Sequence, residues 1–246
     1  MQFMISWIGI LLLAISSLAA QEIPPGTVLP VMLSSTLDAR HDQPGEAISG
    51  KIMQDVPLPD GTKIPRGAKV TGHVVSVSTA SAGSPSQLTL KFDQVRFDDK
   101  RIAIAPQLRA LASMNEVYEA RMPTNAWDDY GTSLADWNTV QIGGAGVFRG
   151  NGEVIGDGKV VGRATFYGAV TARLMAAPER GCPAGGEHEQ ALWKFSPWAC
   201  GTYGLRAVKI VQSSDAAEIV LQSSDNLRIQ GGSGWLLVNG GACSAK

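Results

Sequence analysis

Apolar and polar residues alternate in short stretches along the first half of this chain. Residues 88–95 show the pattern well, with the period of a strand that has one buried face. Similar stretches at 27–33, 46–53 and 68–75 are separated by turn-forming Pro-Gly and Pro-Asp-Gly sequences. Consecutive short strands without intervening helices predict a mainly β fold, either an antiparallel barrel or a sandwich.

The same five-residue pattern precedes two of these strands. Ile23-Pro24-Pro25-Gly26-Thr27 returns as Ile64-Pro65-Arg66-Gly67-Ala68, each followed by an apolar stretch. Proline fixes φ and glycine permits the positive φ that some tight turns need. We therefore predict that Pro24–Gly26 and Pro65–Gly67 are structural turns, each of which starts a strand.

The pattern divides the chain into regions. Residues 21–107 carry the alternating stretches and are expected to form the β core. Residues 108–142 are expected to be an irregular acidic-aromatic segment, within which 108–112 form a short helix or an irregular stretch. Residues 143–246 are expected to form a glycine-rich, cysteine-containing β region. This region is either separate or completes the same domain as residues 21–107.

Three expectations concern the C-terminal region. Asp157-Gly158 is a strong hairpin signal. Residues 163–177 fit either a helix or strands. Residues 203–211 predict one strand, and the chain ends in further short strands.

Residues 1–20 have the composition of a signal peptide. An apolar run over residues 8–15 ends in small residues, although no Lys or Arg precedes it. The run is short for a membrane span, which takes about 20 apolar residues. We expect export to the periplasm or the extracellular space, with an uncleaved anchor as the alternative.

Export would affect the chemistry of the three cysteines. In an oxidising compartment Cys182 and Cys200 are candidates for a disulfide, with Cys243 left over and other pairings open. A metal site that uses His188 with these cysteines matches no zinc spacing, so no metal is expected.

Composition limits the partner classes. The chain of 246 residues is 44% hydrophobic and 17% charged, with a net charge of −1. No overall basic field for nucleic acid or anionic lipid follows from these values, so any membrane contact would be by association only.

Catalytic patterns are sparse. The three histidines are scattered, and no nucleophile elbow, zinc-protease motif or phosphate-binding loop occurs. We predict a non-enzymatic protein without a cofactor. One acidic-aromatic group fits either a solvated loop or a glycan site in which carboxylates act on a stacked sugar ring; it consists of Trp127, Asp128, Asp129, Asp136 and Trp137.

A second aromatic group lies between the candidate disulfide cysteines. Trp193 and Trp198, with Phe195 between them, fit either a small satellite core or an exposed binding patch.

The repeated corners, with Pro44-Gly45 and a second strand between them, give residues 23–75 a resemblance to the TrbI-like family, which extends loosely to residue 107. This family supplies the outer-membrane channel component of type IV secretion and conjugation systems, and the matching part is its C-terminal β-barrel domain. The resemblance implies a β-barrel and a place in the cell envelope. The family's apolar pore-forming hairpin has no counterpart in residues 107–140, which are charged.

Three functions remain open from the sequence. The first is an exported, non-enzymatic interaction or assembly component of the envelope, whose partner is an unidentified protein or glycan. The alternatives are a glycan-binding or glycan-cleaving protein that uses residues 127–137, and a channel subunit of a secretion or conjugation system. The oligomeric state is left open.

Overall fold

The computed structural model describes residues 23–122, 141–144, 147–148, 152–165, 168–211, 213, 215 and 217–240, and these are mainly strands. The large sheet is built from β1 (Val28–Leu33), β3 (Ala47–Ile52), β6 (Lys69–Ser78), β7 (Ser86–Phe97), β8 (Lys100–Ala103), β9 (Pro106–Ala112), β15 (Gly201–Tyr203), β16 (Val208–Val211), β17 (Ile219–Ser223) and β19 (Gly234–Asn239).

The remaining elements are smaller. A second sheet contains β10 (Val147–Phe148), β11 (Glu153–Gly156), β12 (Lys159–Ala164), β13 (Val170–Ala172) and β14 (Gln190–Trp193). Two short ribbons pair β2 (Leu37–Asp38) with β18 (Arg228–Ile229) and β4 (Val56–Pro57) with β5 (Lys63–Ile64). The helices are α1 (Met114–Glu119) and the 3-10 turn η2 (Pro178–Arg180).

The large sheet curls into a nearly closed barrel. Its strand order is β15-β9-β19-β1-β3-β6-β7-β17-β16, with β8 beside β7. All of these pairs are antiparallel except β15–β9. At the two ends of this order, Thr202 in β15 donates a hydrogen bond from Oγ1 to the carbonyl of Val208 in β16, at 3.1 Å. The predicted mainly β, barrel-like fold is therefore confirmed.

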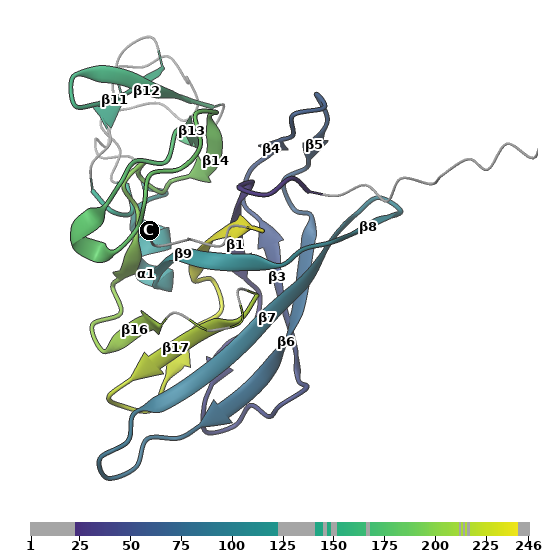
Figure 1. The fold of residues 1–246 in the computed structure, drawn as a ribbon, viewed down its shortest axis with the longest axis vertical. Coiled ribbons are helices and arrows are strands. Elements are labelled where there is room, and N and C mark those ends of the chain that lie inside the picture. Colours follow the sequence, from purple (N-terminus) through teal and green to yellow (C-terminus); the bar gives the residue numbers. More distant parts are fainter. Residues whose placement is uncertain are drawn as a thin grey trace, which may run out of the picture.

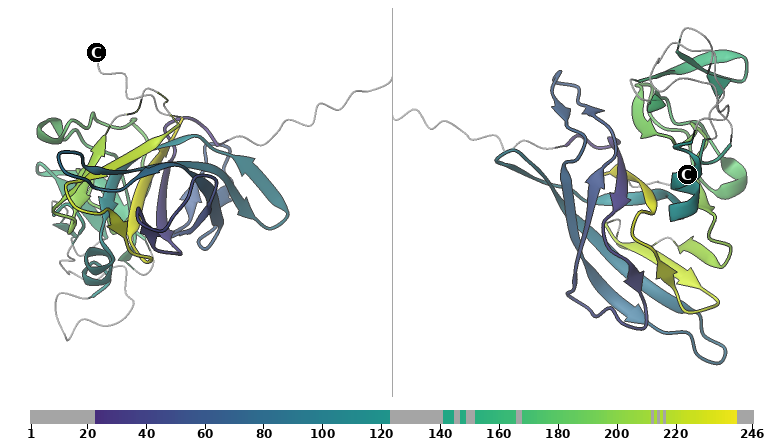
Figure 2. Two further views of the ribbon diagram at one scale, coloured as in Figure 1. Left: turned by 90° about the horizontal axis from the view of Figure 1, so that it is seen from below. Right: turned by 180° about the vertical axis from the view of Figure 1, so that it is seen from behind.

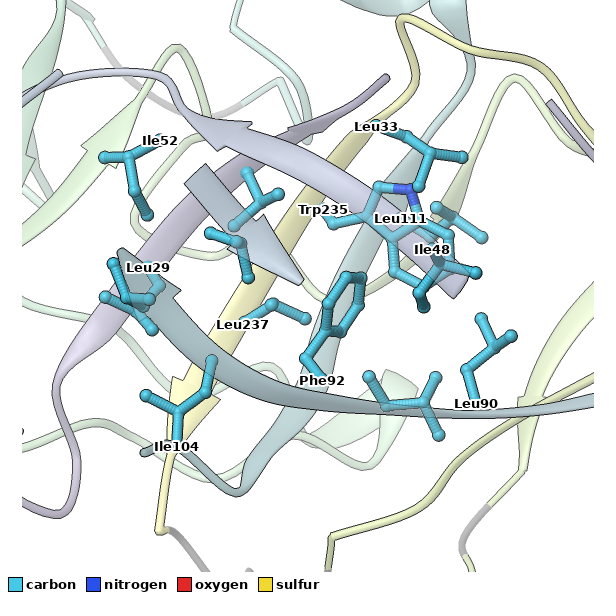
Figure 3. Packing of buried hydrophobic residues seen from close by; sticks show 14 of the residues in the cluster. Leu29, Leu33, Ile48, Ile52, Leu90, Phe92, Ile104, Leu111, Trp235 and Leu237 are labelled. Carbon is cyan, nitrogen blue, oxygen red and sulfur yellow. The ribbon is translucent and has the colours of Figure 1, made fainter. Parts of the chain in front are cut away.

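Three neighbouring strands, β9, β19 and β1, are buried on both faces. Leu111, Trp235 and Leu29 point into the barrel, where Trp235 meets Phe92 edge to face with 5.8 Å between ring centroids (Figure 3). The opposite faces of the same strands contribute to a second core, which also contains Leu192 and Phe195 of the second-sheet region. The second sheet accordingly lies against one side of the barrel, at the end where β4 and β5 project (Figures 1 and 2).

The repeated corners are tight turns with one geometry. Gly26 and Gly67 have φ of 82° and 87°, and the amide after each glycine donates to the carbonyl of Pro24 or Pro65. The glycine amides themselves donate to the ends of neighbouring strands, Gly26 to Asn239 at 2.7 Å and Gly67 to Ile52 at 2.8 Å. Each corner therefore joins the start of one strand to the end of its neighbour.

Residues 108–112 differ from the expectation of a helix or an irregular stretch, because they belong to β9. Leu236 pairs with Ala110 while Leu237 pairs with Leu108, so Arg109 is the extra residue of a β-bulge. The bulge interrupts the two-residue period, and burial on both faces removes the polar positions that mark most strands. Residue 107 is thus inside a strand.

The C-terminal region gives two further outcomes. The hairpin at Asp157-Gly158 is confirmed, with positive φ at both residues. The single strand expected over residues 203–211 was wrong, because the chain turns at Gly204, where φ is 66°, between β15 and β16. Of residues 163–177, those in regular elements belong to β12 and β13.

The corner geometry makes a stability prediction. A Cβ at Gly67 would meet nothing within 4 Å, so Gly67→Ala adds only the strain of a left-handed backbone. We expect this change to lower the free energy of unfolding by about 1–2 kcal/mol in urea titrations. Gly186→Ala is the control, because that site is equally open but its φ lies outside the positive region. Equal effects of the two changes would contradict the turn assignment.

Candidate functional site

The acidic-aromatic group predicted over residues 127–137 lies outside the part of the chain that the structure describes. Trp127, Asp128, Asp129, Asp136 and Trp137 all lie outside the described residues. Their glycan-site interpretation therefore stays a prediction.

The second aromatic group lies within the described residues, and its three members have different surroundings. Phe195 is fully buried in the second core. Trp198 is half-buried and its ring covers Gly156 of β11, where an added Cβ would come within 2.3 Å of it. Trp193 is 8% exposed and has the guanidinium of Arg121 5.6 Å from its ring centroid. Only Trp193 lines a cleft.

The disulfide Cys182–Cys200 is confirmed, with 6.1 Å between the Cα atoms. Next to it Arg109, which is 8% exposed, reaches out of the β9 bulge and donates three hydrogen bonds to carbonyls. The acceptors are Ala199 at 3.1 Å and Pro183 and Met175 at 2.6 Å each. The disulfide and Arg109 together hold the loops that carry β14. Among the described residues, no group of three or more His, Cys, Asp and Glu is arranged to hold a metal.

A cleft of about 720 Å³ lies between the barrel and the second sheet. Its apolar lining includes Met32 of β1, Met53 after β3, and Trp193 at the end of β14. Lys51 and Arg121 are among its cationic residues. Because β1 and β14 belong to different sheets, the cleft exists only where the two sheets pack together.

The backbone at Trp193 is strained. Its φ is 55°, in the left-handed region that bulky side chains rarely adopt. The cause is a register shift between β13 and β14, where Val170 pairs with Trp193 and Thr171 already pairs with Ala191. Such conformations cost about 1–3 kcal/mol and concentrate at functional sites. The strained residue is the one whose ring contacts Arg121 at the cleft.

Lys194, the next residue, is a buried cation. It is only 4% exposed, and burial lowers the pKa of its amine from 10.5 to about 8. Strongly shifted ionisable groups in clefts are markers of functional sites. Lys194 lies between Trp193 and Phe195 in an otherwise apolar run. This position in the sequence was a signal that could have indicated a buried lysine.

Gln54 adds a buried acceptor to the same cleft. It is 5% exposed and donates from Nε2 to the carbonyl of Val170 at 2.9 Å, but its Oε1 has no hydrogen-bond partner. Buried polar atoms are nearly always paired, so an exception needs an explanation. No sequence pattern indicated Gln54.

Among the described residues that line the cleft, Asp55 carries the only carboxylate, and this group is already engaged. Lys63 donates to it, and the backbone amide of Arg66 donates to its other oxygen at 2.8 Å. Both interactions, the Lys63 bond first, lower the pKa of Asp55. The cations of the cleft therefore outnumber its carboxylate, and the arrangement suits recognition of a group that is both anionic and partly apolar.

Burial of Lys194 predicts a pH effect on stability. Between about pH 8 and pH 10.5 the unfolded lysine keeps its proton while the buried one has lost it, so the wild type gains stability as pH rises. We expect Lys194→Met to be more stable than wild type near pH 7, with the difference shrinking by about 3 kcal/mol across this window.

Chemical denaturation from pH 7 upward, with exposed Lys209→Met as the control, measures the difference. Parallel curves for wild type and Lys194→Met would contradict the buried state of Lys194.

Within the described residues, no helix is long and apolar enough to cross a membrane. Comparison with family models and with curated proteins found no match for this chain. The resemblance to the TrbI-like family therefore stays a prediction.

Proposed function

We propose that this chain is an exported, non-enzymatic component of the cell envelope that binds a partner protein in the cleft between its barrel and its second sheet. The observation that carries the proposal is the cleft itself, in which strained Trp193, cationic Arg121 and the unpaired Oε1 of Gln54 converge. A strained backbone and a buried polar atom without a hydrogen-bond partner both lower the stability of the fold. Their occurrence in one cleft therefore favours a binding role.

The disulfide supports the proposed compartment. Disulfides persist in oxidising environments such as the periplasm and the extracellular space. The composition of residues 1–20 and the resemblance of residues 23–75 to an envelope family favour the same place.

A protein partner is favoured by the surface beside the cleft. Tyr118 and Met122 of the α1 region are 62% and 50% exposed, and Arg121 lies between them in sequence. Methionine-rich and aromatic surfaces adapt to peptide partners, and exposed apolar patches mark such contacts. A partner that places an acidic side chain near Arg121 and an apolar one on Met32 and Trp193 fits this surface.

Site-specific photo-cross-linking in the producing organism tests the proposal. A benzophenone amino acid at Met122 or Met32 is expected to capture one and the same protein, identified by mass spectrometry. The same group at Ser84, in the loop between β6 and β7, is expected to capture none, because that loop is at the far end of the barrel.

Adding Arg121→Glu to the Met122 derivative is expected to abolish the product without lowering Tm, because it reverses the charge at the cleft. Equal products from Met122, Met32 and Ser84, or none from Met122 and Met32, would overturn the proposal.

A further inference from the structure

Four cationic side chains form a row across the outer face of the barrel. Lys51 in β3 lies opposite Lys69 in β6, Lys69 lies opposite Arg96 in β7, and Arg96 lies opposite Arg101 in β8. All four residues are exposed. We call this set the cationic row.

Like charges directly opposite each other on neighbouring strands destabilise a sheet. Some cations outside the row are neutralised: Lys91 in β7 is 2.7 Å from Asp215, and Lys63 in β5 is paired with Asp55. Among the ion pairs between described residues, none involves a member of the cationic row. The row therefore keeps four unneutralised charges together at a cost to the fold.

A row of neutral polar side chains runs beside the cationic row. Two residues further along each strand, and hence on the same face, Ser49 lies opposite Thr71 and Thr71 lies opposite Gln94. Thr71 Oγ1 is buried and has no hydrogen-bond partner. On the other side of the row, Lys69, Arg96 and Phe97 border a groove of about 500 Å³.

We propose that the cationic row and its polar neighbours bind a linear acidic glycan of the cell envelope. The glycan's carboxylates would contact the row, and its hydroxyls would contact the half-buried Ser49 and Gln94. Charge complementarity supplies the attraction. A bound polyanion would also offset the repulsion between the cations of the row.

The neutral polar row beside the cations favours a glycan over an acidic peptide. Neighbouring strands are about 4.8 Å apart, so the four cations follow a line of about 14 Å. An acidic peptide such as poly-glutamate has side-chain carboxylates but no hydroxyls, so its side chains would engage the cations and leave Ser49 and Gln94 unused. A polyuronate carries a carboxylate and several hydroxyls on each ring, so both kinds of group can lie against the paired rows.

The surroundings also disfavour a membrane surface. The hairpin that joins β7 and β8 places exposed Asp98 and Asp99 just beyond Arg96. Anionic headgroups approaching the row as a plane would meet these carboxylates, whereas a single polymer chain can follow the row and avoid them.

Binding of polygalacturonic acid to the mature protein, residues 21–246, measured by biolayer interferometry, tests the proposal. We expect wild type to bind at low salt and binding to weaken as salt rises, since exposed charges are screened. Lys69→Gln with Arg96→Gln should raise Kd roughly tenfold. Lys159→Gln with Lys209→Gln, two exposed cations elsewhere, is the matched control and should leave Kd unchanged.

Stability separates loss of binding from loss of folding. Because the double change in the row relieves repulsion, its Tm should equal or exceed that of wild type. Neither Lys69 nor Arg96 lines the cleft, so this test is independent of the cleft partner.

The occupant is identified by parallel probes. Ser49→Ala with Gln94→Met should weaken polygalacturonate binding without affecting poly-glutamate, and vesicles with anionic headgroups should bind less well than the glycan. Failure of polygalacturonate to bind would overturn the proposal. Equal losses in the Lys69/Arg96 and Lys159/Lys209 double variants, or tighter binding of poly-glutamate or vesicles, would overturn it as well.

Discussion

Burial of β9, β19 and β1 on both faces is the constraint on which the rest of the structure depends. One face of these strands closes the barrel core around Trp235 and Phe92, and the other forms the floor of the second core. Each of these strands therefore buries apolar side chains on both of its faces. Burial of apolar surface stabilises the fold by about 25 cal/mol per Å². The second sheet has its place because the outer faces of these strands are apolar and must be covered.

The same constraint produces the cleft. The second sheet packs on β1 through β14 and leaves space beside the end of β3, which is lined by Met53 and Gln54. Arg109 fixes the spacing, because its three carbonyl bonds connect β9 to the loops around the disulfide. Hydrogen bonds to a charged donor are stronger than neutral ones, which offsets the burial of the guanidinium. The strained Trp193 and buried Lys194 are held against this anchored frame.

Local signals in the sequence were sufficient for part of the fold. The turns at Gly26 and Gly67 and the hairpin at Asp157-Gly158 depend on backbone preferences of a few adjacent residues. The expected compartment made Cys182–Cys200 a candidate disulfide, but other pairings stayed open until the structure showed this one. The pairing of β1 with β19, which joins the two ends of the described chain, carries no local signal.

The functional surfaces depend on that long-range pairing. Lys51, Lys69, Arg96 and Arg101 are dispersed in a chain of net charge −1, and only the register of four strands aligns them. The composition therefore indicated no basic surface, although a local one exists. Gln54 and Arg121 likewise line one cleft only because two sheets pack together. The bulge at Arg109 hid β9 from a two-residue pattern.

Native-state hydrogen exchange under increasing denaturant is the most direct test of the shared strands. If β9, β19 and β1 serve both cores, their amides exchange only through global unfolding, and those of β13 and β14 open in the same transition. Exchange of the β13 and β14 amides through a separate opening of much lower free energy, with β9, β19 and β1 still protected, would contradict the dependence of the second sheet and the cleft on these strands.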